Sequence, residues 1–136
     1  MIDKEIIRIA SNTENHGALD SHTHFLKLKN SICGDDMKIY LIVENDKITN
    51  FKYECESCIY CQASVSLLSR KAKNKSIEKV KNFAQQANSY FDKSTNSFDK
   101  EWKEFDKIMT KNNISRKECL LLPINATLDA LNKKSL

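Results

Sequence analysis

The chain has 136 residues, with 22 Lys and Arg against 18 Asp and Glu, and a formal net charge of +4. This length suits one ordinary domain that buries its own core, and the presence of only 2 glycines and 1 proline argues against repeat or fibrous architectures and long linkers. The basic residues are mixed with acidic ones and are not interleaved with aromatic side chains, so the sequence predicts no nucleic-acid partner. It shows no leader pattern and no apolar run long enough to span a bilayer, so we expect a soluble, cytoplasmic protein with no membrane partner.

The first predicted elements are a short helix and a small sheet. The helix covers residues 3–10, with Ile6, Ile7 and Ile9 on its apolar face. After a polar loop, residues 24–30, 37–43 and 48–54 are rich in β-branched and aromatic residues, and the turn-like ENDK separates the last two. Three such segments in succession predict an antiparallel meander.

Helical spacing replaces this pattern from about residue 59. The first helix has an apolar face of Ala63, Leu67, Leu68 and Ala72. Ser76 is the expected N-cap of a second helix over residues 77–91. Strands followed by helices predict an α+β fold, a single domain with a three-stranded antiparallel meander sheet packed against several helices.

Two more helices are predicted near the end of the chain. One covers residues 101–109, where Trp102, Phe105 and Met109 recur at helical spacing. The other follows Cys119, with Pro123 in its first turn, where the missing N–H of proline does no harm. Its apolar face consists of Leu121, Ile124, Leu128 and Leu131.

The 5 cysteines carry the functional signal. An odd number in a reducing compartment favours metal binding or sulfur chemistry over a disulfide framework. All lie at the ends of predicted elements, which can converge at one edge of a small sheet, and helix N-termini favour the thiolate that binds metals. Cys33, with Asp35 two residues later, could join the others in a tetrahedral zinc site or hold an iron–sulfur cluster with one labile corner.

The triplet Cys55, Cys58 and Cys61 permits another interpretation. Its C-x₂-C-x₂-C spacing is three quarters of a ferredoxin-type cluster loop, although Val65 stands where the fourth cysteine would be and the continuation is helical. An electron-transfer or structural metal module built on the triplet is therefore the alternative. Taken singly, Cys55 and Cys61 are equally well explained as small buried residues.

The remaining candidate ligands are weaker. His16, His22 and His24 are expected at exposed loop or strand-start positions. Asp36 is expected to be a solvated neighbour of Asp35.

Two segments resemble a known family. NSICGDDMKIYLIVENDKITNFKYECESCIYCQASVSLLSRKAKNKSIEKV and ISRKECLLLPINATLDAL are similar to the IscU/SufU/NifU-N-terminal scaffold proteins of iron–sulfur cluster assembly. That family carries an asparagine-led C-G-D loop, then a cysteine before an alanine- and serine-rich helix, then a third cysteine at a C-terminal helix. The resemblance implies that Cys33, Asp35, Cys58 and Cys119 are the metal and sulfur residues.

The spacing resembles the SufU branch of the family. Cys58 and Cys119 are 61 residues apart, which corresponds to a helical insertion at about residues 83–113 within one domain spanning residues 1–136. Arg116 stands three residues before Cys119 as in SufU-like proteins, and Glu118 stands where IscU proteins have histidine. The resemblance implies a zinc site and the acceptance of persulfide sulfur from a cysteine desulfurase of the SufS/IscS type.

What the resemblance implies is a sulfur carrier or scaffold that does not act as an independent enzyme. Cys119 is the expected sulfur acceptor, and the same ligands are expected to hold iron in a nascent [2Fe–2S] cluster for transfer to apo-protein acceptors. Ser57 replaces the usual glycine before Cys58, Ser31 stands where the family commonly has proline, and the chaperone-recognition segment of IscU is absent. Cys55 and Cys61 are extra thiols, which we expect to be accessory to a site in which Cys58 is the ligand.

Overall fold

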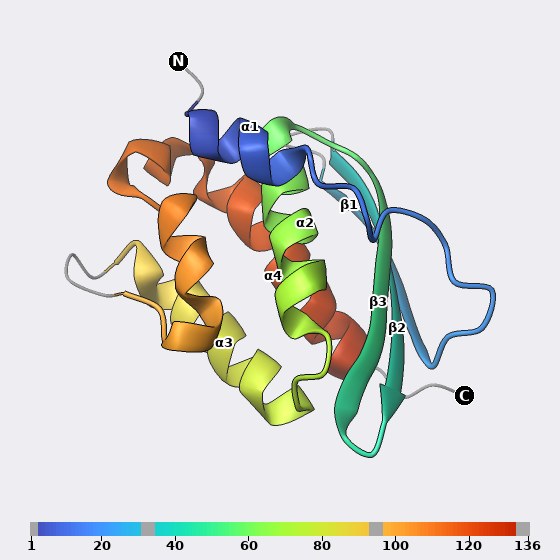
Figure 1. Ribbon diagram of the computed structural model, residues 1–136. Coiled ribbons are helices and arrows are strands. Elements are labelled where there is room, and N and C mark those ends of the chain that lie inside the picture. The colour runs from blue at the N-terminus through green and yellow to red at the C-terminus, as the bar shows by residue number, and fades with distance from the viewer. Residues whose placement is uncertain (1–2, 31–34, 93–96, 133–136) are drawn as a thin grey trace.

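The sheet confirms the predicted antiparallel meander. A computed structural model describes residues 3–30, 35–92 and 97–132, and only the backbone of residues 30 and 35 (Figure 1). Three strands follow one another in the order β1-β2-β3: β1 spans His24–Asn30, β2 spans Asp35–Glu44 and β3 spans Lys47–Glu56. Asn45 and Asp46 connect β2 to β3 with positive φ angles of 51° and 62°, as a tight hairpin turn requires and as Asn and Asp tolerate best.

The helices lie together on one side of the sheet (Figure 1). They are α1 (Lys4–Ala10), α2 (Ile59–Ala72), α3 (Ile77–Tyr90) and α4 (Lys117–Asn132), with the 3₁₀ helices η1 (Lys100–Lys107) and η2 (Lys111–Arg116) between α3 and α4. This arrangement confirms the α+β fold with a single domain. In the described part of the chain, none of the helices is long and apolar enough to cross a membrane.

Cross-strand pairs build the sheet's half of the core. Ile39 lies opposite Tyr53, and Leu41 lies opposite Phe51, with every one of these side chains at most 2% exposed. Met37, which is 1% exposed, lies opposite Cys55 and continues the same row toward the end of the sheet. Because residues directly opposite in an antiparallel pair share a face, Cys55 is on the face that the helices cover.

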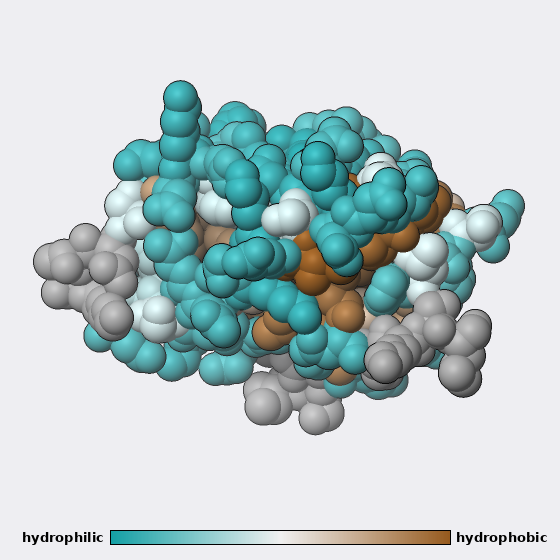
Figure 2. All heavy atoms as spheres, turned by 90° about the horizontal axis from the view of Figure 1, so that it is seen from below, coloured by the Kyte–Doolittle hydropathy of each residue, from teal (hydrophilic) through white to brown (hydrophobic). Residues whose placement is uncertain are grey.

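Helix α2 runs through the middle of the molecule and packs against β3, with α4 beside it against β1 and β2 (Figure 1). Its predicted apolar residues are buried, and so are three serines, each of which makes a hydrogen bond. These buried side chains and hydrogen bonds hold the two ends of the helix at fixed positions relative to the sheet. Seen from below, the surface of the molecule is mostly polar, with an apolar band across its centre (Figure 2).

Among the predicted details of the helices, one agrees with the structure and two differ from it. Ser76 caps α3, its side chain accepting a 3.1 Å hydrogen bond from the backbone of Lys79. Ile7, expected on the apolar face of α1, is 49% exposed, because the helix turns Ile6, Ile9 and Ala10 toward the core instead. Residues 101–109 do bury Trp102 and Phe105, but they form the 3₁₀ helix η1 instead of an α-helix.

The last helix begins earlier than predicted. Helix η2 leads directly into α4, because Lys117 already has helical φ and ψ angles. Cys119 therefore lies inside the first turn of α4, and Pro123 lies in the helix interior. Proline has no N–H, so Pro123 cannot donate the usual hydrogen bond to the carbonyl of Cys119, four residues earlier.

The region predicted as an insertion contains part of α3, then η1 and the first half of η2. Phe83 of α3 stacks on Trp102 of η1, with ring centroids 4.2 Å apart and an interplanar angle of 13°. Phe105 packs on Phe83 as well, at 4.7 Å. An aromatic cluster thus attaches this region to the core, while its assignment as an insertion stays a prediction.

Candidate metal and sulfur site

Cys58 is the N-cap of helix α2. It has extended backbone angles, φ −67° and ψ 162°, and its carbonyl accepts the first helical hydrogen bond, 3.0 Å, from the backbone of Gln62. The Gln62 side chain reaches back and donates a 2.8 Å bond to the carbonyl of Ser57. The thiol of Cys58, which is half-buried, is thus held by a well-defined turn at the point where β3 ends and α2 begins.

Two contacts place the start of α4 beside the start of α2. The hydroxyl of Ser64 donates a 2.6 Å hydrogen bond to the carbonyl of Leu120. The guanidinium of Arg116 lies over the ring of Tyr60, 5.3 Å from its centroid. Since these contacts come from the residues on either side of Cys119, they bring the first turn of α4, with its buried cysteine, next to the first turns of α2.

The connection from β1 to β2 returns to the same end of the sheet. Asn30 pairs with Asp35, and Asp36 pairs with Glu56, two residues before Cys58. The backbone of Asp35 therefore begins β2 where β3 ends. Cys33 and the side chain of Asp35 lie outside the described residues, so their part in the site stays a prediction.

The three cysteines of the triplet lie in three different settings. Cys55 is the last residue but one of β3, on its helix-covered face, Cys58 caps α2, and Cys61 is fully buried in the core at 0% exposed. Among the residues that the structure describes, no group of three or more His, Cys, Asp or Glu side chains is arranged to hold a metal ion. Because all three triplet cysteines are described, the structure gives no support to the ferredoxin-like alternative.

The histidines occupy the positions expected of them. His24 is the first residue of β1, and burial lowers the pKa of its imidazole. His22 is exposed and stacks on Phe25, with ring centroids 5.5 Å apart. His16 is exposed as well, but its ring packs edge-on against Tyr53 of β3, at 5.4 Å and 83°.

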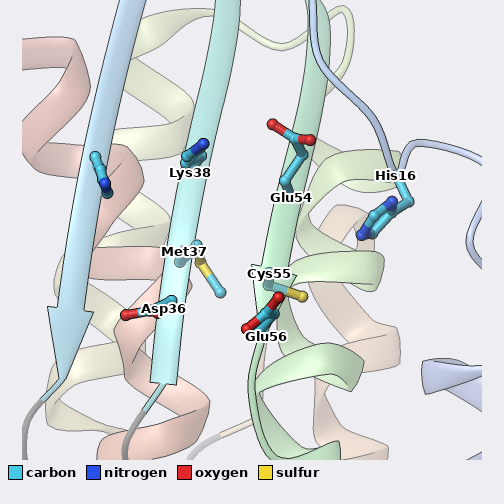
Figure 3. Close-up of a pocket in the computed structure, with 8 residues that line it drawn as sticks. His16, Asp36, Met37, Lys38, Glu54, Cys55 and Glu56 are labelled. Carbon is cyan, nitrogen blue, oxygen red and sulfur yellow. The ribbon is translucent and has the colours of Figure 1, made fainter.

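His16 and Cys55 line two hollows at the end of the sheet. The first, of about 360 Å³, lies over the strand ends, where Asp36, Glu54 and Glu56 carry the acidic groups (Figure 3). The second, of about 460 Å³, lies between α1, β3 and the start of α2 and is also lined by Tyr53 and Gln62. Residues 16 and 55 are far apart in the sequence, and no local pattern links them, so sequence reasoning missed this pairing.

Tyr53 lines the second hollow, and the pKa of its phenol reflects the polarity of this corner of the molecule, where His16 and Cys55 also lie. Burial raises the pKa of its phenol, and the charge of Cys55 raises it further, while a hydrogen bond with Ser66 opposes them. The phenol therefore stays protonated and neutral beside the thiol. The corner combines a thiol, an imidazole and an amide with a neutral phenol.

The comparisons with known proteins agree on one family. A family model described as the NifU-like N terminal domain matches residues 1–93. The iron-sulfur cluster assembly scaffold protein IscU of Thermotoga maritima is 28% identical over 135 residues, which cover 99% of this chain and 95% of that protein.

Solved structures share the fold. A NifU-like protein (N-terminal) from Brucella abortus superposes with a TM-score of 0.88 at 19% identity, covering 96% of this chain and 91% of that one. A putative iron-sulfur cluster assembly scaffold protein for the SUF system from Fervidobacterium islandicum AW-1 gives a TM-score of 0.84 at 23% identity, covering 96% of each chain. Because the family model matches well over half of its residues, the chain belongs to the NifU-like N-terminal domain family.

Proposed function

We propose that this protein takes part in iron–sulfur cluster assembly through a site made of Cys33, Asp35, Cys58 and Cys119. The observation that carries the proposal is the position of Cys58 and Cys119 at adjoining helix starts, at the end of the sheet where β1 connects to β2. Membership of a family of scaffold proteins supports it, as do the scaffold functions named for the relatives.

The donor chemistry fits zinc and iron alike. Three thiolates and one carboxylate suit a tetrahedral zinc ion, and the same set suits a [2Fe–2S] cluster as cargo, with the carboxylate as the exchangeable ligand. A bound metal ion keeps its thiolates deprotonated and links the β1–β2 connection to the two helices. The likeness to a SUF-system scaffold is consistent with the SufU branch, for which we expect zinc as the resident metal.

Sulfur arrives as a persulfide from a cysteine desulfurase in the cytoplasm. A thiolate of this chain attacks the outer sulfur, a new S–S bond forms as the donor's S–S bond breaks, and the desulfurase cysteine leaves as a thiolate. Cys119 is the predicted acceptor in this carrier scheme, and apo-proteins are the recipients of an assembled cluster. Cys119 is only 1% exposed, so this scheme requires a local rearrangement that brings its thiol to the surface.

Metal analysis of protein purified without oxygen tests the proposal. One zinc per chain and a colourless solution support the SufU scheme, while brown protein with iron and sulfide supports the scaffold scheme. The variants Cys58→Ser and Cys119→Ser are expected to lose the metal, whereas Cys61→Ala, a small-for-small change in the core, keeps it. Metal content that is unchanged in both serine variants would contradict the site.

A further inference from the structure

Side-chain and backbone hydrogen bonds fix the segment that carries His16. The side-chain amide of Asn15, a residue only 3% exposed, donates a 3.0 Å bond to the hydroxyl of Ser69 on α2. The backbone of Tyr53 donates to the carbonyl of Asn15 at 3.2 Å, and the backbone of Gly17 donates to the carbonyl of Tyr53 at 2.8 Å. His16 thus sits between two residues tied to β3, and its ring rests on Tyr53 although it is exposed.

Cys55 lies on the same strand, two residues beyond Tyr53, and therefore on the same face. Both hollows at this corner are lined by Cys55 and His16. In Figure 3 the sulfur of Cys55 points to the side of β3 on which the His16 ring lies. An incoming group thus meets a thiol and an imidazole on the same side of the strand.

The cysteines differ sharply in exposure. Cys61 and Cys119 are 0% and 1% exposed, whereas Cys55 and Cys58 are half-buried. A persulfide carried by another molecule reaches the half-buried thiols first. Cys58 is a predicted metal ligand, so among the described cysteines Cys55 is the half-buried thiol that lies outside the predicted ligand set.

We propose that Cys55 is an accessory sulfur acceptor, with His16 positioned to take up its thiol proton. Cys55 receives sulfane sulfur from a persulfide at the surface and holds it beside the Cys58 and Cys119 site. This inference rests on the proposed sulfur-handling function and adds a second acceptor, at a position outside the four predicted ligands.

The transfer balances without an added oxidant or reductant. His16 takes the proton of the Cys55 thiol, and the thiolate attacks the outer sulfur of the donor R–S–SH. The S–S bond of the donor breaks as the S–S bond to Cys55 forms. The leaving thiolate recovers the proton, so the products are R–SH and the Cys55 persulfide.

Persulfide mapping by mass spectrometry tests the proposal. The whole protein is treated with cysteine persulfide without oxygen, alkylated, digested, and analysed by peptide fragmentation, because one tryptic peptide contains Cys55, Cys58 and Cys61. Wild-type protein is expected to gain one sulfur at Cys55 before any appears at Cys119. His16→Ala is expected to slow labelling of Cys55 by about a hundredfold or more, the lower end of the usual contribution of a positioned base, and added imidazole restores it.

His22→Ala is the matched control, since His22 is also exposed but belongs to the ring cluster with Phe25. It is expected to label Cys55 at the wild-type rate, with or without imidazole. An unlabelled Cys55 would overturn the proposal, as would a His16→Ala rate equal to that of His22→Ala. Zinc content separates the two proposals. Wild-type protein with normal zinc but no sulfur at Cys55 overturns only this proposal, whereas a Cys58→Ser variant that loses zinc and still gains sulfur at Cys55 supports both.

Discussion

Ser64 and Leu120 are joined by a 2.6 Å hydrogen bond from hydroxyl to carbonyl, and both residues are fully buried. This bond connects the first half of α2 to the first turn of α4, one residue beyond Cys119. The separation of Cys58 and Cys119 therefore depends on how firmly two helices are held together, in addition to the local structure around each cysteine.

Replacing Ser64 by alanine tests that dependence. Ser64→Ala is expected to lower the free energy of unfolding by about 1 kcal/mol, the usual net value of one hydrogen bond, and to weaken zinc binding as well. Urea unfolding and zinc titration measure the two effects. Ser115→Ala, at an exposed position in η2, is the control and is expected to change neither. Equal zinc affinity in the two variants would show that the bond does not set the site.

The aromatic cluster makes a separate prediction about stability. Phe83 is 2% exposed and contacts both Trp102 and Phe105, so Phe83→Ala is expected to cost about 3–5 kcal/mol of unfolding free energy through lost burial and the cavity left behind. Trp102 is the single tryptophan, and its emission is expected to shift to the red as η1 loosens. Phe25→Ala, at a side chain 39% exposed, is expected to cost much less. Comparable losses would mean that η1 packs only loosely on α3.

The tyrosines predict how stability changes in alkali. A hydrogen bond to Glu54, then burial, raises the pKa of Tyr40 above its ordinary value of 10.0. A pKa raised by folding contributes stability that is fully present below pH 10.0 and is lost as the pH rises through the folded-state pKa. Tyr40→Phe is therefore expected to be less stable than wild type at neutral pH, with the difference shrinking in alkali.

Urea unfolding at neutral pH and above pH 10.0 checks this sign. Glu54→Gln, which keeps a hydrogen-bonding side chain but removes the carboxylate charge, is expected to flatten the alkaline loss. A difference between Tyr40→Phe and wild type that grows with pH would contradict the assignment.

The sheet and the central helix could be predicted from sequence because their patterns are local. β1 has the predicted bounds, and α2 begins at the predicted residue, since alternation and helical spacing depend on near neighbours. The sequence predicts an α-helix where the structure has the 3₁₀ helix η1, because Trp102 and Phe105 are three residues apart, a spacing that suits both helix types. It predicts Pro123 in a first turn, because the sequence does not show that η2 runs into α4.

The candidate site was predictable only in part. Cys58 at a helix start follows from the pattern, but the proximity of Cys119 depends on Ser64, Leu120, Arg116 and Tyr60, which no periodicity connects. The pairing of His16 with Cys55 depends on Asn15, which is held by Ser69 on α2. Contacts of this kind are long-range and specific, so they appear only when the chain is folded.

Zinc titration of single cysteine variants tests the central claim, that Cys58 is the metal ligand of the triplet. Cys58→Ser is expected to lose zinc affinity by far more than a hundredfold, while Cys55→Ser and Cys61→Ser are expected to lose about 10–100-fold or less, as is usual for groups beside the ligands. Circular dichroism of the metal-free proteins confirms that each variant folds. Wild-type affinity in Cys58→Ser, together with a large loss in Cys55→Ser or Cys61→Ser, would contradict the account.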